Sequence, residues 1–265
     1  MKLGIVTISF NQAKYLQEAI DSVTLAAPEN LVYVVVDPGS KDGSREIIGR
    51  NQGRFARMVL EPDKGPTDGL NKGFAACDAD IYGYLNSDDR FVPGALDWVY
   101  RYFEAHPEID LLLGAIRIID EAGKAKFRGR APDRLDLTKY VHASCYFWQQ
   151  ATFFRRSLYE KTRGFNPESR VFWDGELVLD MVLAGARVSY TNTILGDFRI
   201  YPGSITGSLS QAARWKVEYG WFQERIAKAG YKTMTAGEEK RARLIYKYNP
   251  LRHLNCAFGI SMPQV

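Results

Sequence analysis

The first 115 residues alternate short apolar runs with stretches whose apolar residues recur at helical spacing. Leu31–Val36 is an unbroken, valine-rich apolar run, typical of a strand buried on both faces of a parallel sheet. The expected strands are Leu3–Ser9, Leu31–Val36, Ala56–Leu60, Ile81–Leu85 and Ile109–Leu113, and the expected helices are Ala13–Val23, Ser44–Ile48, Pro66–Ala76 and Pro93–Ala105. This alternation predicts an α/β fold with a mostly parallel sheet, flanked by helices and joined by right-handed crossovers.

The alternation ends near residue 115. Ala115–Asp120 and Lys124–Arg130 flank Glu121-Ala122-Gly123, a pattern that predicts a hairpin. The elements expected after it are helices at Leu158–Arg163 and Glu176–Ala184, short strands at Val188–Tyr190 and Ile194–Ile200, and helices at 209–229 and 236–248. The simplest organisation is one domain over residues 1–208, with halves at about 1–115 and 116–208, followed by a helical C-terminal extension over 209–265.

The composition is that of an ordinary globular protein: 265 residues, 46% hydrophobic, with a net charge of +4. This charge permits anionic substrates or an anionic membrane surface but requires neither. Cys77, Cys145 and Cys256 are too widely spaced for a disulfide framework or a zinc site, which favours a reducing cytoplasm. The N-terminal run reads as a strand and not as a signal peptide. No run reaches the roughly 18 apolar residues of a membrane span, so we expect any membrane contact to be peripheral.

Acidic residues follow two of the expected strands. Asn86-Ser87-Asp88-Asp89 comes directly after Ile81–Leu85, and Asp37 comes directly after Leu31–Val36. α/β proteins bind ligands at the carboxyl edge of the sheet, where these strands end. Carboxylate oxygens suit Mg²⁺ or Mn²⁺, ions that usually arrive with phosphates attached. The pattern indicates a nucleoside-diphosphate site, although Asp and Ser are also ordinary turn and helix-cap residues.

Six segments in a fixed order carry a family resemblance. They are Val6–Asn11, Val36–Ser44, Glu61–Gly65 with Asp68 and Asn71-Lys72-Gly73, Tyr84–Asp89, Gln150–Arg156, and Trp173–Leu177. Together they resemble the inverting nucleotide-sugar glycosyltransferases of family 2, which have the GT-A fold. The resemblance covers roughly residues 3 to 205, and it is the order of the six segments, more than any one of them, that makes it specific.

The resemblance implies that residues 1–115 form the nucleotide-sugar half. The residues that would bind the donor there are Ser9, Asp37, Gly39, Asp42, Lys64, Asp68 and Asn86. Ser9 would offer a small hydroxyl beside the base, and Asp37 would accept a hydrogen bond from a base N–H. The imide of uracil is the natural partner of Asp37, so a UDP-sugar is favoured. Asn86 stands where the family usually has Asp, and its amide can still bond a ribose hydroxyl.

The resemblance also implies a metal ion, Mn²⁺ or Mg²⁺. Asp88 would be its main ligand and Asp89 the next, with diphosphate oxygens and water completing the shell. The ion would neutralise the leaving diphosphate as a Lewis acid.

Residues 116–208 would then form the acceptor half. Inversion needs one general base for the acceptor hydroxyl. Asp174, which precedes an apolar helix, is the candidate, and Glu176 is the alternative. Both are also residue types that a helix N-terminus favours. Trp173 would stack on an acceptor sugar or pack in the core, and Gln150 would orient the donor sugar or the base.

Two other enzyme classes fit the chain less well. A sugar-1-phosphate nucleotidyltransferase needs a glycine-rich, basic phosphate loop after the first strand, and a nicotinamide dehydrogenase needs G-x-G-x-x-G there. This chain has Ser9-Phe10-Asn11-Gln12 instead. The leading hypothesis is a metal-dependent inverting glycosyltransferase of polysaccharide or lipopolysaccharide biosynthesis, acting on a saccharide or lipid-linked acceptor. The alternative is a catalytically impaired nucleotide-sugar binder or scaffold, since Asn86 and Trp173 depart from the family pattern.

The C-terminal region is basic. Its charged residues Lys240, Arg241, Arg243, Lys247 and Arg252 interleave with the apolar residues Leu244, Ile245, Tyr246, Tyr248 and Leu251. Such a pattern is typical of a helix at an anionic lipid surface, at the inner face of the cell membrane, or of a solvated helix face. No nucleic-acid motif is present, so we expect no nucleic-acid partner.

Overall fold

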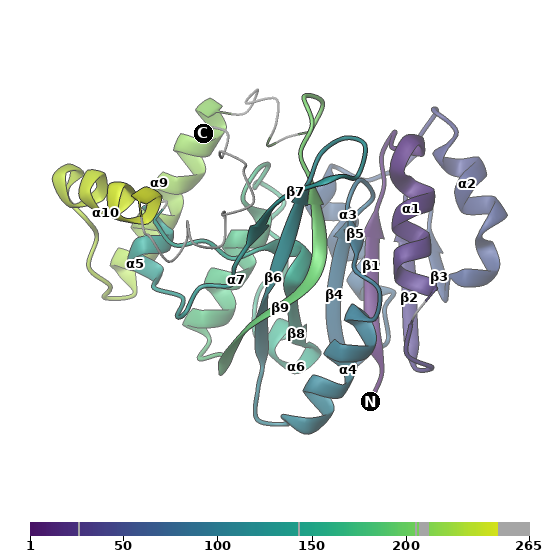
Figure 1. Ribbon diagram of the computed structural model, residues 1–265, viewed down its shortest axis with the longest axis horizontal. Coiled ribbons are helices and arrows are strands. Elements are labelled where there is room, and N and C mark those ends of the chain that lie inside the picture. Colours follow the sequence, from purple (N-terminus) through teal and green to yellow (C-terminus); the bar gives the residue numbers. More distant parts are fainter. Residues whose placement is uncertain (26, 143, 205, 207–211, 249–265) are drawn as a thin grey trace.

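The computed structural model describes residues 1–25, 27–142, 144–204, 206 and 212–248. A single twisted sheet runs through the molecule, and helices α9 and α10 lie at one side of it (Figure 1). The strands are β1 (Leu3–Ile8), β2 (Leu31–Val36), β3 (Arg57–Val59), β4 (Ile81–Asn86), β5 (Arg90–Phe91), β6 (Leu111–Ile119), β7 (Ala125–Gly129), β8 (Thr152–Arg155) and β9 (Val188–Arg199). The helices are α1 (Ala13–Thr24), α2 (Ser44–Arg50), α3 (Pro66–Ala75), α4 (Ala95–Ala105), α5 (Leu137–Tyr140), α6 (Arg156–Tyr159), α7 (Trp173–Leu183), α9 (Ala212–Lys228) and α10 (Ala236–Tyr248). Short 3₁₀ turns lie at Gln52–Arg54 and Gln149–Ala151.

The strand order is β3-β2-β1-β4-β8-β6-β9-β5, and β7 pairs with β6. The first four strands, β1 to β4, are parallel to one another. β8 is antiparallel to both β4 and β6, whereas β9 is parallel to β6. The sheet is therefore mixed and mostly parallel, as the alternation predicted.

Two apolar cores lie on opposite faces of the sheet. Because side chains alternate along a strand, Ile5 of β1 points to one face and Val6 to the other. The core containing Ile5 is closed by α1, α2 and α4. The core containing Val6 is closed by α3, α7 and α9, and Phe222 of α9 is fully buried in it. The C-terminal helix α9 thus packs directly on the second core.

The predicted elements of the first half are observed within two residues at each end, apart from Ile109–Leu113. That strand continues as β6 to Ile119 and includes the first arm of the predicted hairpin. Gly114 allows this continuity because the Leu195 and Ala151 side chains fill the space where a Cβ would lie. Val188–Tyr190 and Ile194–Ile200 are likewise one strand, β9, with register shifts. β8 was not predicted as a strand.

In the second half of the chain, the observed helices differ from the predicted ones in where they begin. α6 begins two residues before the predicted Leu158, and α7 begins at Trp173 and not at Glu176, so Asp174 lies in its first turn. The predicted boundary between residues 208 and 209 lies outside the described residues, as do Leu251, Arg252 and Cys256. Cys77 and Cys145 are buried free thiols. Within the described part of the chain, no helix is both long and apolar enough to cross a membrane.

Candidate active site

The carboxyl ends of β1, β2 and β4 meet at one edge of the sheet. Ile8 is in register with both Val36 and Asn86, so the residues that follow these strands come together. Ser9, Asp37 and the acidic turn 86–89 therefore share one edge, as the sequence predicted. The N-terminus of α3 reaches the same edge, because α3 is the crossover that leads back to β4.

Asp37 holds the loop between β2 and α2. Its Oδ1 accepts hydrogen bonds from Gly39 N, Ser40 N and Arg45 Nε at 2.7–2.9 Å, and its Oδ2 accepts one from Ser40 Oγ at 2.6 Å. Burial opposes ionisation, but these bonds keep the pKa of Asp37 below its ordinary value. Gly39 has φ +130°, a conformation that favours glycine. Both carboxylate oxygens are occupied within the loop, so they shape the wall of the site.

Asp42 joins the loops that follow β1 and β2. Its Oδ2 accepts a hydrogen bond from Ala13 N at the start of α1, at 2.8 Å. Its Oδ1 accepts from Ser44 N and Ser44 Oγ at the start of α2. Asn11, at φ +52°, completes the junction by accepting from Lys41 N. Asp42 thus caps two helices at once. Although the residue is exposed, both of its carboxylate oxygens are engaged by the protein.

The turn before α3 forms the other wall. Asp68 accepts a hydrogen bond from Lys64 N at 3.0 Å and pairs with Lys72. The Lys64 side chain is exposed, and its backbone oxygen accepts from Arg170 Nη1 at 3.0 Å. The last contact connects the donor-side turn to the loop that leads into α7.

The acidic turn contains two carboxylates with different surroundings. Asp89 is 1% exposed, and its oxygens accept from Arg199 N and Gln150 Nε2 at 2.8 Å and from Asn86 Nδ2 at 3.4 Å. Asp88 is partly exposed, and its Oδ2 accepts from the Tyr201 hydroxyl at 3.2 Å. Burial raises the pKa of both groups, and the charge of Asp88 raises that of Asp89 further. Asp88 is therefore the more accessible of the two carboxylates, and Asp89 is enclosed by the protein.

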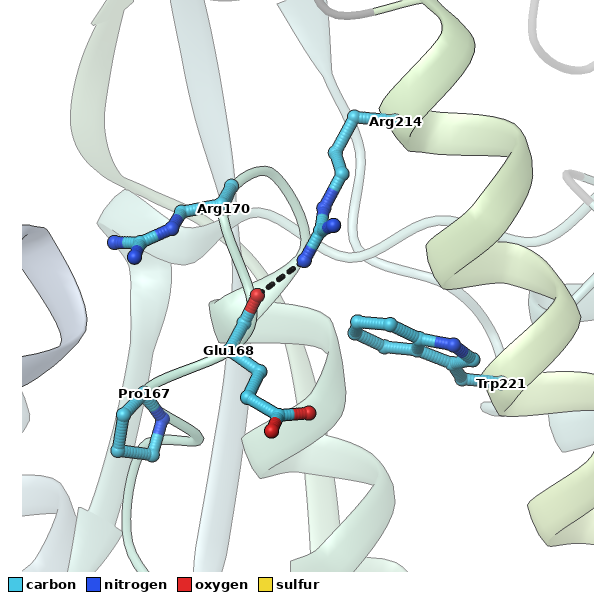
Figure 2. A pocket seen from close by; sticks show the side chains of 5 residues that line it. All are labelled: Pro167, Glu168, Arg170, Arg214 and Trp221. Atoms are coloured by element: carbon cyan, nitrogen blue, oxygen red, sulfur yellow. Dashed lines mark hydrogen bonds between the residues drawn. The ribbon is translucent and has the colours of Figure 1, made fainter.

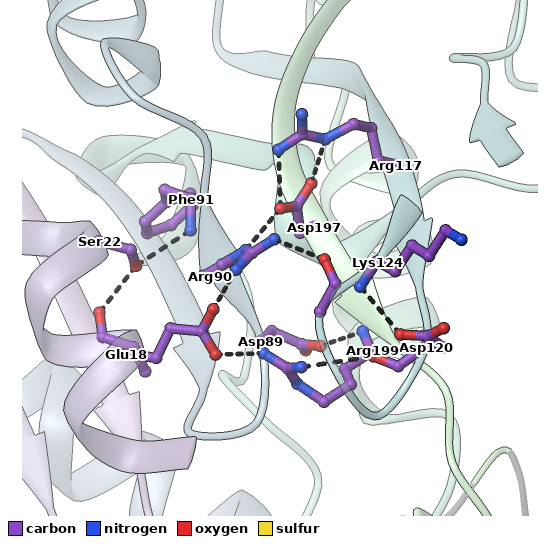
Figure 3. A network of polar contacts seen from close by, with 12 residues as sticks. Glu18, Ser22, Asp89, Arg90, Phe91, Arg117, Asp120, Lys124, Asp197 and Arg199 are labelled. Atoms are coloured by element: carbon purple, nitrogen blue, oxygen red, sulfur yellow. Dashed lines mark hydrogen bonds and ion pairs between the residues drawn. The ribbon is translucent and has the colours of Figure 1, made fainter. Parts of the chain in front are cut away.

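Arg199 holds the acidic turn in place through a network of polar contacts (Figure 3). This guanidinium is buried, donates from Nε to Asp88 O at 2.7 Å and pairs with Glu18 at 2.5 Å. It also donates to Glu121 O in the hairpin and lies 4.7 Å from the Tyr15 ring centroid. The donors of Arg199 are thus engaged by the protein.

Three buried polar atoms at this edge have no hydrogen-bond partner among the residues that the structure describes: Ser9 Oγ, Thr67 Oγ1 and Asn86 Oδ1. Buried polar atoms are normally paired, and an unpaired one costs about 1–3 kcal/mol. They come from the ends of β1 and β4 and from the first turn of α3. Ser9 and Asn86 were predicted donor-binding residues. Thr67 was missed, although the proline before it marks the helix start.

Asp174 is in the first turn of α7. In the described part of the chain, no side chain donates a hydrogen bond to it. Burial raises the pKa of Asp174 to about 6, and the charge of Glu218 adds to this effect. A carboxyl group with a pKa near the working pH suits proton transfer.

Glu176, two residues after Asp174, has a carboxylate that is engaged by three neighbouring side chains. Its carboxylate accepts from Asn166 Nδ2 at 3.0 Å, from Arg225 Nη1 at 3.0 Å and from Arg163 Nη2. Glu176 is 3% exposed. Two guanidinium groups stabilise its charge, so these contacts favour Asp174 over Glu176 as a base.

Trp173 is 8% exposed and belongs to the apolar core that α7 closes, so of its two predicted roles the contacts favour packing. Gln150 holds Asp89, and the neighbouring Gln149 donates to Tyr84 O at 2.6 Å.

Beside α7 lies a shallow pocket, lined by Pro167, Glu168, Arg170, Arg214 and Trp221 (Figure 2). Sequence reasoning missed this pocket because its two walls, the loop 167–170 and the residues Arg214 and Trp221 of α9, lie 44 or more residues apart in the chain.

A family model described as "Glycosyl transferase family 2" matches residues 4–163. The chain belongs to glycosyl transferase family 2. It is 28% identical over 260 residues to an uncharacterised glycosyltransferase of Mycobacterium tuberculosis, covering 93% of each chain. An uncharacterised glycosyltransferase of Nostoc sp. is 24% identical over 211 residues, which are 76% of this chain and 65% of that one. This family 2 chain is therefore a nucleotide-sugar-dependent glycosyltransferase.

Solved structures show the same GT-A fold. TarS 1–349 of S. aureus in complex with UDP-GlcNAc has a TM-score of 0.66 at 14% identity, covering 99% of this chain and 77% of that one. The mannosyltransferase PcManGT of Pyrobaculum calidifontis, in complex with GDP-Man and Mn²⁺, has a TM-score of 0.63 at 16% identity, covering 97% and 73%. The fold predicted from the sequence is confirmed.

Proposed function

We propose that this enzyme transfers a sugar with inversion from a nucleoside-diphosphate donor to a hydroxyl of a saccharide or lipid-linked acceptor, with Asp174 as the general base. One observation carries this proposal: Asp174 is free of side-chain donors among the described residues, while Glu176 is bound by two arginines. Asp174 takes the acceptor proton as the hydroxyl oxygen forms its bond to the anomeric carbon. The bond from that carbon to the diphosphate breaks, and the diphosphate leaves with the electron pair.

The donor end is proposed at the edge formed by β1, β4 and α3. Ser9 Oγ, Thr67 Oγ1 and Asn86 Oδ1 would gain hydrogen bonds there, and the walls held by Asp37 and Asp42 would shape the pocket. A UDP-sugar is favoured. In support, TarS, a structural neighbour, binds UDP and UDP-GlcNAc.

A divalent cation fits this edge through one carboxylate. No group of three or more His, Cys, Asp or Glu side chains in the described ranges is arranged to hold a metal. Asp88 is nevertheless partly exposed, and its Oδ1 has no side-chain partner within the described ranges. Mg²⁺ is often held by one carboxylate plus substrate phosphates. Asp88 would hold the ion, whereas Asp89, with both oxygens engaged, would position the turn. When bound, the ion supplies positive charge at the leaving diphosphate.

The acceptor end is proposed beside the loop 167–170. The pocket in Figure 2 offers the aromatic surface of Trp221, the exposed carboxylate of Glu168 and the guanidinium of Arg170, groups suited to a saccharide chain. Minor teichoic acid biosynthesis protein GgaA of Bacillus subtilis, 24% identical over 68% of this chain and 43% of that one, supports a role in cell-envelope polymer synthesis.

Contact with an anionic membrane is proposed for α10. Lys240 and Arg241 are exposed, and so are Leu244 and Ile245 at 46% and 60%. His142 holds this helix to the body, accepting from Met234 N and pairing with Glu239. Flotation with phosphatidylglycerol vesicles should recover the protein, and Leu244→Ser/Ile245→Ser should not float; equal flotation of both would contradict this contact.

The test of function begins with calorimetric titration by UDP, GDP and dTDP, with and without Mn²⁺. Binding of one nucleotide that requires Mn²⁺ supports the donor site and Asp88. The matching nucleotide sugar is then incubated with the enzyme, and the anomeric configuration of the product is read by NMR. An inverted product supports the proposal and a retained one contradicts it. Donor binding without any turnover would instead favour the catalytically impaired binder.

A further inference from the structure

A buried carboxylate on α9 accepts hydrogen bonds from the loop that leads into α7. Glu218 is fully buried, although it lies 44 residues beyond Asp174 in the chain. The groups that donate to it are Ser169 Oγ (2.8 Å), Arg170 N (2.8 Å), Val171 N (3.3 Å), Phe172 N (3.0 Å) and Arg214 Nε (2.8 Å). Four of these five donors belong to the loop directly before α7.

Three successive backbone N–H groups that converge on one point form an anion-binding nest. The helix they lead into has no cap of its own, because the side chain of its N-cap residue, Phe172, accepts no hydrogen bond. Burial opposes ionisation of Glu218, but the bonds from Arg170 N and Arg214 hold its pKa below the ordinary value. Glu218 is therefore an anion at neutral pH, and from α9 it binds the backbone N–H groups of the three residues directly before α7.

Aromatic contacts fix the same junction. The Phe172 ring lies 4.4 Å from that of Tyr219 and 5.8 Å from that of Phe222, both on α9. Asp174 follows Phe172 by two residues, so the loop, the first turn of α7 and Asp174 are held as one unit by α9.

The titratable groups that interact electrostatically with Asp174 are the hydroxyls of Tyr84 on β4, Tyr140 on α5 and Tyr219 on α9, together with the Glu218 carboxylate. In the described ranges, Glu218 is the one of these that is charged at neutral pH. Burial is the main cause of the raised pKa of Asp174, and the negative charge of Glu218 raises it further.

We propose that Glu218 is a positioning residue for sugar transfer: it fixes the loop that enters α7 and thereby the position and surroundings of Asp174. This inference rests on the proposed function, because it matters for catalysis only if Asp174 is the base. It places part of the catalytic machinery in the C-terminal helical extension.

The test uses the full chain and two readouts. The first is NMR titration of Asp174 in protein carrying ¹³C-labelled aspartate, with the signal assigned by its loss in Asp174→Asn. The second is kcat for UDP-GlcNAc hydrolysis with Mn²⁺. In Glu218→Gln we expect the pKa of Asp174 to fall by roughly 0.5–1 unit, because a nearby negative charge is removed. We expect kcat to fall about 10- to 100-fold, because the first turn of α7 shifts, with an unchanged donor KM.

Two further variants separate structure from function. Ile226→Ala also loosens α9, since Ile226 is fully buried, but it leaves the Glu218 carboxylate in place. Its melting temperature should fall while the titration of Asp174 stays as in the wild type. Glu218→Asp keeps the charge on a shorter side chain, so kcat should fall with little shift in that pKa, and this variant serves if Glu218→Gln does not fold.

The outcomes are distinguishable. A wild-type titration of Asp174 in Glu218→Gln overturns this inference whatever the rate, as does a pKa shift of equal size in Ile226→Ala. Wild-type hydrolysis by Asp174→Asn overturns the proposed function instead.

Discussion

The two ends of the site hold their carboxylates in different ways. On the donor side, Asp37 is bound by residues two, three and eight positions along the chain. On the acceptor side, Glu176 pairs with Arg225 across 49 residues, and Glu218 binds Arg170 N across 48. The wall held by Asp37 is thus a local structure within one short segment, whereas the loop before Asp174 depends on a helix supplied much later in the chain.

The strongest way to break this comparison is Asp174→Asn. If the acceptor side contributes chemistry and the donor side binding, kcat should fall about 10²- to 10⁴-fold while UDP affinity is unchanged. Glu176→Gln is the matched control: it perturbs the ion pairs with Arg163 and Arg225 and should lower stability more than rate. A larger rate loss in the control than in Asp174→Asn would reverse the two assignments.

Asp88→Asn breaks the donor side. We expect kcat to fall roughly 100-fold and the Mn²⁺ concentration for half-maximal rate to rise, because the more accessible carboxylate of the acidic turn is lost. Activity is measured against Mn²⁺ concentration. A wild-type Mn²⁺ dependence would exclude Asp88 as the metal ligand.

The pH dependence sharpens the acceptor side. A base must be deprotonated to act, and the pKa of Asp174 is raised to about 6. Turnover should therefore fall about tenfold for each pH unit below 6 and level off above it. The kcat profile from pH 4.5 to 8 checks this, and a profile that is flat down to pH 5 would argue for another base.

Asp37→Asn tests the local wall. It removes the charge that pairs with Arg45 and replaces the acceptor oxygen that binds Ser40 Oγ with an amide donor, so the free energy of unfolding should fall by about 2 kcal/mol. Asp21→Asn breaks a more exposed pair with Arg54 and should change it by less than about 1 kcal/mol. Urea denaturation of both variants makes the comparison, and equal losses would count against it.

Ser9→Ala has the smallest expected effect. Its Oγ is buried without a partner, so its removal should leave the free energy of unfolding nearly unchanged. If the hydroxyl meets the nucleotide, UDP affinity should still fall several-fold, which calorimetry measures. A variant that loses stability but binds UDP normally would place Ser9 outside the donor site.

How much could be predicted from the sequence depends on how far apart the interacting residues lie in the chain. The Asp37 loop was predictable because glycines and short-range acceptors define it, and the parallel strands followed from their uninterrupted apolar runs. β6 and β9 were each read as two pieces, because Gly114 and a polar stretch around Asn192 interrupt the patterns. Nothing in the sequence near Glu218 or Arg199 reveals their partners, which lie 48 and 110 residues away. The prediction of Asp89 as a metal ligand likewise took no account of its distant donors, Arg199 N and Gln150 Nε2.

Arg199 has a consequence for how the chain assembles during synthesis. The strands that deliver Asp88 and Asp89 are complete by residue 89, but the buried cation that secures them is translated 110 residues later. At the usual pace of synthesis, roughly 5–20 residues per second, the nascent acidic turn waits several seconds for its final contacts. Until β9 joins β6, the emerging protein can form its donor-side sheet but not the finished acidic turn, so the enzyme acquires its architecture before its active site.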